Sequence, residues 1–135
     1  QVGTYNGNPL VMAAAKATLF DIMTPESYDH LNALNDRLLQ GCDRVLDKYR
    51  LPGYSVGISS KGCVTYAQEK ITDYESFKAN SHGELVDLAW VYGMNRGIYV
   101  TPGREEEWTL SVQHSMQDAD RYVGMLEELT HELVA

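Results

Sequence analysis

Residues 24–53 read TPESYDHLNALNDRLLQGCDRVLDKYRLPG, and this stretch determines the framework of the fold. Thr24 is a good N-cap, Pro25 suits the first helical position, and Pro52-Gly53 does not continue a helix. Between these signals apolar side chains recur at steps of three and four residues. They are Leu31, Leu34, Leu38, Cys42, Val45, Leu46 and Tyr49. The pattern predicts one long amphipathic helix with a buried face.

Downstream of this helix the chain alternates weakly between apolar and polar residues. Residues 54–60 and 63–68 flank Lys61-Gly62, and this arrangement predicts a β-hairpin that turns at Lys61-Gly62. Residues 73–79 then predict a short helix or an irregular connection. The hairpin would supply a sheet on which the long helix can pack.

The last third of the chain predicts two more helices and two short strands. Ser81-His82-Gly83-Glu84 has capping-box spacing and opens a helix that Arg96-Gly97 closes. Residues 98–100 and 108–114 are predicted strands, and Ser115–Asp118 opens the final helix. The residues expected to face inward are Leu85, Leu88, Ala89, Val91 and Tyr92 on the first helix, and Tyr122, Met125, Leu126, Leu129 and Leu133 on the second. The predicted fold class is α+β, with helices covering one face of a small, mainly antiparallel sheet.

Upstream of the long helix, Gly3-Thr4-Tyr5-Asn6-Gly7-Asn8-Pro9 forms a predicted loop. Asn8 can cap, and Pro9 can begin, a helix over residues 9–22. A glycine-containing loop with a hydroxyl beside a helix N-terminus can bind an anion such as a phosphate. The same residues also suit an ordinary turn before a helix, and the loop chemistry leaves both interpretations open.

Composition excludes some classes of function. The chain has 135 residues, enough for one domain, with a formal net charge of −8. An acidic balance argues against nucleic acid and against anionic membrane surfaces as partners, and no apolar run reaches the roughly 20 residues of a membrane span. Cys42 and Cys63 lack the spacing of metal ligands. We expect them to be free thiols in a reducing cytoplasm and not to form a disulfide.

The order of residues at the two ends resembles the class III pyridoxal-phosphate-dependent aminotransferases, and most of all their glutamate-1-semialdehyde aminomutase branch. Three segments show the resemblance: the motif Gly-Thr-x-x-Gly-Asn-Pro-Leu-x-Met-Ala-Ala that begins at Gly3, the segment Met94–Gly103, and the segment Leu110–Ser115. Their spacing matches as well, so the resemblance extends over essentially the whole chain. It implies the C-terminal small domain of a fold-type I enzyme, with residues 1–22 as an interdomain motif and linker helix and residues 23–135 as the small domain.

The resemblance also implies roles for particular residues. Gly3 and Thr4 would hold the phosphate of pyridoxal 5'-phosphate bound to the neighbouring protomer of a homodimer. Arg104 and Glu106 would lie near an amine or amino-acid-like substrate, since Glu106 matches an acidic residue of the family's active-site loop and an Arg can bind a carboxylate with two hydrogen bonds. The sequence departs from the aminomutase pattern around Glu106, because Glu105 and Glu107-Trp108-Thr109 replace an aromatic and Ala-Gly-Phe. This difference favours a related enzyme of other specificity.

The family's Schiff-base lysine lies some tens of residues before the Gly-Thr pair, where this sequence has no counterpart. Lys16, Lys61, Lys70 and Lys78 do not stand in that context. We therefore expect the chain to be the C-terminal part of a larger enzyme and to be inactive alone. The rival hypothesis is a free-standing, noncatalytic α+β module that binds a partner or a small anion.

The sequence gives weaker support for two other kinds of site, a serine nucleophile and a metal site. Gly53-Tyr54-Ser55-Val56-Gly57 matches a nucleophile-elbow pattern, but that motif needs a strand before its serine and a helix after it, and here a Pro-Gly turn precedes and a strand follows. The four histidines are scattered and give no zinc spacing. Neither a serine nucleophile nor a metal site is expected.

Overall fold

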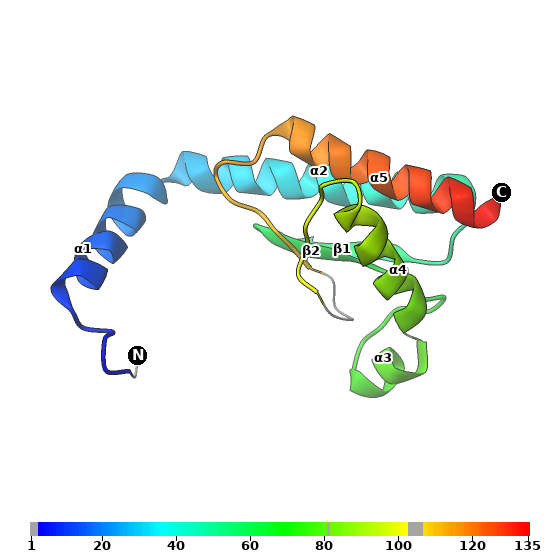
Figure 1. The fold of residues 1–135 in the computed structure, drawn as a ribbon, viewed down its shortest axis with the longest axis horizontal. Helices are drawn as coiled ribbons and strands as arrows, with labels where there is room; N and C mark the ends of the chain where they lie inside the picture. Colours follow the sequence, from blue (N-terminus) through cyan, green and yellow to red (C-terminus); the bar gives the residue numbers. More distant parts are fainter. Residues whose placement is uncertain (1–2, 81, 103–106) are drawn as a thin grey trace.

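The computed structural model describes residues 3–80, 82–102 and 107–135. A long helix pair lies over a small sheet, and an N-terminal helical arm projects away from both (Figure 1). In chain order the elements are α1 (Pro9–Ala17), the π-helix η1 (Thr18–Ile22), α2 (Pro25–Tyr49), β1 (Tyr54–Ile58), β2 (Lys61–Thr65), α3 (Tyr74–Asn80), α4 (Gly83–Met94), β3 (Glu107–Thr109) and α5 (Met116–Val134).

Helix α2 forms as predicted. The Thr24 hydroxyl accepts a hydrogen bond from the Ser27 N–H at 3.4 Å, and Arg50 ends the helix in the left-handed conformation, with φ 54°. The predicted stripe is buried apart from Tyr49, which is partly buried against the core. The periodicity did not single out Asn35 and Gly41, which are also buried on this helix. Gly41 lets the Val123 side chain of α5 approach the α2 backbone closely.

The sheet is antiparallel with strand order β1-β2-β3, which confirms the predicted fold class. The predicted hairpin turn was wrong. Ile58 pairs with Lys61 and Gly57 with Gly62, so the turn is Ser59-Ser60 and Lys61-Gly62 belongs to β2. Gly62 stands inside the strand because the Trp108 ring packs directly on it: a Cβ there would lie 2.5 Å from the ring.

Two strand predictions near β3 also need correction. Residues 98–100 are not a strand; the Val100 carbonyl instead accepts a hydrogen bond from the Trp90 indole of α4 at 3.1 Å. The strand predicted over 108–114 ends at Thr109, because the Ser111 N–H donates to His114 Nδ1 at 2.8 Å and the chain turns there. A side-chain donor thus occupies the Val100 carbonyl in the first case, and a nearby side-chain acceptor occupies the Ser111 N–H in the second.

Helix α4 begins one residue later than the capping-box pattern predicted. Its N-cap is His82, while Ser81 lies outside the described residues. Val86, Ala89 and Gly93 are buried, whereas Leu88 and Val91 are 43% and 49% exposed, so both were wrongly assigned to the inner face. The helix ends at Met94, two residues before the predicted Arg96-Gly97. The predicted glycine still closes the turn that follows: Gly97 has φ 73°, the Ile98 N–H donates to the Gly93 carbonyl, and the Gly97 N–H donates to the Met94 carbonyl.

Helix α5 begins with the predicted capping box. The Ser115 hydroxyl accepts from the Asp118 N–H, and the Asp118 carboxylate accepts from the Ser115 N–H. Met125, Leu126 and Leu129 are buried as expected. Leu133 is 42% exposed, contrary to prediction, because it lies in the last turn of α5, where little packs against it.

Helices α2 and α5 lie side by side and cover one face of the sheet (Figure 1). The Val64 and Trp108 side chains point from the sheet into this layer, where the core forms. Helix α4 packs against α5 and adds Val86 and Ala89 to the same core. Within the part of the chain that the structure describes, no long helix lies on the opposite face of the sheet.

The predicted helix over 9–22 is present as α1 and η1. The Asn8 side chain caps it by accepting from the Val11 N–H at 3.0 Å, and Pro9 is its first residue. None of its residues is buried, because the arm extends away from the domain (Figure 1). Among the described residues, no helix is long and apolar enough to cross a membrane.

Candidate functional site

The loop before α1 places Thr4 at the surface. Gly3 has φ +152°, a conformation that L side chains rarely adopt, and a Cβ there would lie 2.8 Å from the Asn6 side chain. The Asn6 N–H donates to the Gly3 carbonyl at 3.3 Å and the Asn8 N–H donates to the Tyr5 carbonyl at 3.3 Å. These bonds fold residues 3–8 into a compact turn in which Thr4 is exposed.

The chemistry of this loop fits part of a phosphate site. Within the described residues the Thr4 hydroxyl has no hydrogen-bond partner, so it is available to an external acceptor. The positive end of α1 lies a few residues further on. However, the sequence has no Lys or Arg before Lys16, so the loop supplies neutral donors only. A phosphate bound here would need its cationic partners from another part of an enzyme.

The second predicted site residues, Arg104 and Glu106, lie outside the described residues. The described residues on either side of them, Thr101 and Glu107, are joined by a hydrogen bond from the Thr101 N–H to the Glu107 carbonyl at 3.4 Å. The Glu107 carboxylate also lies 3.2 Å from Lys61 Nζ of β2. Figure 1 shows the N-terminal loop at the tip of the arm, well away from the sheet. Within one copy of the chain, Thr4 does not form one site with Thr101 and Glu107, the described residues that flank this segment.

A buried polar contact that sequence reasoning missed anchors the strand after this segment. The Trp108 indole N–H donates to the Asn35 carboxamide at 2.8 Å, and both residues are buried. The Trp108 ring also packs edge-on against Tyr122, with ring centroids 5.4 Å apart. In the sequence, the one indication of this contact was the position of Asn35, a polar residue beside Leu34 on the apolar face of α2.

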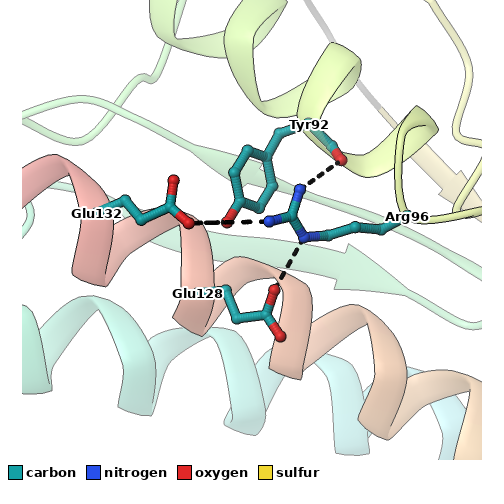
Figure 2. Close-up of polar contacts among 4 residues, drawn as sticks. All are labelled: Tyr92, Arg96, Glu128 and Glu132. Atoms are coloured by element: carbon teal, nitrogen blue, oxygen red, sulfur yellow. Dashed lines mark hydrogen bonds and ion pairs between the residues drawn. The ribbon is translucent and has the colours of Figure 1, made fainter.

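A surface cluster joins α4 to α5 (Figure 2). The Arg96 guanidinium stacks on the Tyr92 ring, 3.4 Å from its centroid, and its Nε lies 2.9 Å from Glu128. Glu132 accepts from the Tyr92 hydroxyl at 2.7 Å and lies 3.8 Å from the Arg96 guanidinium. Every charge here has a partner of opposite sign, so the cluster connects two helices and offers no free catalytic group.

The remaining candidate groups have structural partners. Ser55 donates its hydroxyl to the Leu39 carbonyl at 3.0 Å and its N–H to Asp43 at 2.7 Å, so it is a strand residue tied to α2 and not a nucleophile. Both cysteines are free thiols, as expected. Burial, with a smaller effect of Asp43, raises the pKa of Cys42 to about 12, and burial also raises the pKa of Cys63. In the described part of the chain no three metal-ligating residues gather.

Comparison with known sequences gives a consistent group of relatives. No family model matches the chain. A glutamate-1-semialdehyde 2,1-aminomutase of Lachnoclostridium phytofermentans is 30% identical over 129 residues, covering 95% of this chain and 30% of the relative. The aminomutase of Ruminiclostridium cellulolyticum is also 30% identical and covers 100% of this chain and 31% of its own length. The chain thus spans about three tenths of the length of these relatives.

Solved structures agree with the sequence relatives. A glutamate-1-semialdehyde aminomutase from Pseudomonas aeruginosa superposes with a TM-score of 0.87 at 22% identity, over 98% of this chain and 30% of its own, which establishes the shared fold. A β-phenylalanine aminotransferase from Variovorax paradoxus gives a TM-score of 0.86 at 25% identity over the same shares. The chain is therefore similar to the C-terminal part of class III pyridoxal-phosphate-dependent aminotransferases, and most of all to the glutamate-1-semialdehyde aminomutases among them.

Proposed function

We propose that this chain is the C-terminal part of a pyridoxal-phosphate-dependent aminotransferase or aminomutase that moves an amino group on an amine or amino-acid-like substrate. The observation that carries the proposal is the match of nearly the whole chain to aminomutases of about 30% identity. Relatives bound to pyridoxal phosphate or its amine form support the same cofactor for this chain. When bound, this cofactor supplies the electron sink for amino-group chemistry.

Within such an enzyme we assign residues 1–22 to the interdomain motif and linker helix and residues 23–135 to the small domain. Thr4 would donate its hydroxyl to the cofactor phosphate across a dimer interface, which its exposure at the tip of the arm permits. Arg104 and Glu106 would face the substrate from the loop whose described ends meet at Thr101 and Glu107. The chain alone would be inactive, because the lysine that bonds the cofactor would lie in another domain.

The first test is to read the coding sequence upstream of Gln1. The proposal expects a lysine on a strand–turn segment some tens of residues before Gly3. Its absence would reject the proposal and favour a noncatalytic module. Addition of pyridoxal phosphate to the 135-residue chain is not informative, because neither hypothesis expects a spectral change.

The second test uses the protein encoded by the whole reading frame. Thr4→Ala should weaken cofactor binding roughly 10-fold or more, the cost of about 1.5–3 kcal/mol for a lost hydrogen bond to a charged group. Thr4→Ser keeps the hydroxyl and should restore most of the affinity, while Thr18→Ala, on the exposed arm, is the matched control. Equal dissociation constants for all three variants, measured by cofactor absorbance, would remove Thr4 from the site.

A further inference from the structure

A cavity of about 180 Å³ lies beside the hydrophobic core, between α2, α5, β3 and residues 97–100. Core side chains form its inner wall, among them Leu34 and Leu38 of α2, Ala119 of α5 and Trp108 of β3. Leu34 is 0% exposed and Trp108 is 4% exposed, so this wall is closed to solvent on its far side. An apolar cavity of about 150 Å³ can hold benzene, so this cavity has room for one small ring.

The inner wall suits a flat apolar group. The Trp108 indole N–H already donates to the Asn35 carboxamide at 2.8 Å, so the ring asks nothing polar of a ligand. The Tyr122 ring also lines the cavity and lies edge-on to Trp108, with ring centroids 5.4 Å apart. Aromatic rings pack well against one another in edge-on or offset arrangements. An aromatic ring is therefore a better occupant of this wall than a polar molecule.

The outer end of the cavity carries a cation. Arg121 of α5 lines the cavity and is exposed, and its guanidinium reaches the turn at Gly97, where a Cβ would lie 3.9 Å from Arg121 Nη2. Across the described ranges, Arg121 makes no hydrogen bond or ion pair. A guanidinium can donate two parallel hydrogen bonds to a carboxylate. The cavity thus joins an apolar inner wall to a group that binds carboxylates.

His114 supplies a second donor in the cavity wall. The Ser111 N–H donates to His114 Nδ1 at 2.8 Å, so the neutral ring carries its proton on Nε2. In the residues that the structure describes, His114 Nε2 has no hydrogen-bond partner. His30 of α2 donates to the His114 carbonyl at 2.9 Å, which fixes the backbone of this residue against α2.

Asp118 limits the charge that a ligand can carry, since its carboxylate belongs to the same wall. This carboxylate accepts from the Ser115 N–H and hydroxyl, both at 2.8 Å. A doubly charged phosphate group meets more repulsion from Asp118 than a single carboxylate does. We propose that the cavity binds a small aromatic monocarboxylate, with its ring against Trp108 and its carboxylate on Arg121 and His114. The proposal goes beyond the proposed function and does not depend on it.

The test titrates benzoate into the 135-residue chain and follows the NMR signal of the Trp108 indole N–H. Benzoate should shift this signal saturably, and its ring protons should show nuclear Overhauser contacts to the Leu34 methyl groups. Benzyl alcohol and benzylamine carry the same ring without a negative charge. Both should bind about 10-fold more weakly or worse, since each lacks the charged hydrogen bonds.

Arg121→Gln tests the assigned cation. It should weaken benzoate binding about 10-fold and leave the affinity for benzyl alcohol unchanged. Arg44→Gln is the matched control, because Arg44 is an exposed arginine of α2 that does not line the cavity, and it should change neither affinity. The proposal is overturned if millimolar benzoate leaves the Trp108 signal in place, if the three probes bind equally, or if Arg121→Gln binds benzoate as tightly as Arg44→Gln does.

Discussion

The indole N–H of Trp108 donates to the Asn35 carboxamide oxygen at 2.8 Å, although the two residues are 73 positions apart in sequence. Trp108 is 4% exposed and Asn35 is 2% exposed. This bond connects α2 to β3, the strand that follows the segment carrying the predicted substrate residues. A buried hydrogen bond is valuable mainly because breaking it leaves the other partner unsatisfied.

Trp108→Phe should therefore destabilise the chain by about 1–3 kcal/mol, since the Asn35 oxygen loses its buried donor. Asn35→Leu should have a similar cost, because the indole N–H is then unpaired. The double variant should be less destabilised than the sum of the two single variants. Urea unfolding of all four proteins measures this coupling, and strictly additive free energies would contradict it.

Gly62→Ala should destabilise the chain by about 1–3 kcal/mol through overpacking. The added Cβ would lie 2.5 Å from the Trp108 ring, which the core holds in place. Gly124→Ala is the matched control, because nothing lies within 4 Å of its Cβ position in α5. That control should be neutral or stabilising by up to about 1 kcal/mol, since alanine is a better helix former than glycine. Equal effects of the two substitutions on urea unfolding would contradict this account.

The sequence predicted those parts of the fold that depend on local signals. The α2 stripe and the caps at Thr24 and Ser115 are set by residues within one or two turns, and the structure has them as expected. The error at the hairpin turn came from a distant contact, whereas the early end of β3 came from the local bond between Ser111 and His114. From the sequence alone, Gly62 indicated a turn. In the structure it is a glycine within β2 because the ring of Trp108, a residue far along the chain, packs directly on it.

The candidate site residues were named from a resemblance, and physical reasoning predicted only the loop and the helix cap beside Gly3 and Thr4. The loop at Gly3-Thr4 has the predicted turn and helix cap, yet its donors alone do not make a phosphate site. The roles of Gly3, Thr4, Arg104 and Glu106 stay predictions, because they depend on the cofactor and the additional domain that the proposed function requires. The position of Asn35 on the apolar face of α2 indicated a buried polar group, but its partner Trp108 could not be predicted, since that depends on how α2 lies over the sheet.

Arg96→Lys should lower the thermal midpoint even though it keeps the charge. A lysine ammonium lacks the planar group that stacks on Tyr92 and bonds Glu128 at once (Figure 2). Arg121→Lys is the control, because no hydrogen bond or ion pair of Arg121 occurs in the described parts of the chain. Scanning calorimetry should show a smaller Arg96→Lys effect at high salt, where exposed charges are screened. A midpoint unchanged at low salt would contradict the prediction.

Asp118 should make the stability of α5 depend on pH. Hydrogen bonds from the Ser115 N–H and hydroxyl lower the pKa of the Asp118 carboxyl below its ordinary value of 3.8. Because the folded pKa is the lower one, this stabilisation is complete above about 3.8 and disappears as pH falls through the folded pKa. Asp118→Asn should therefore lower the midpoint at neutral pH, and the difference should shrink in acid. A difference that is independent of pH would contradict the charged capping box.

The exposed apolar side chains of α1 and η1 should make the isolated chain self-associate. Leu19 is 65% exposed and Phe20 is 75% exposed on an arm without a buried residue. An apolar surface of this kind is normally covered by another domain or subunit. Leu19→Lys with Phe20→Lys should shift sedimentation toward monomer, whereas Thr18→Lys on the same arm should not. A wild-type chain that is monomeric at all concentrations would show that the arm needs no partner.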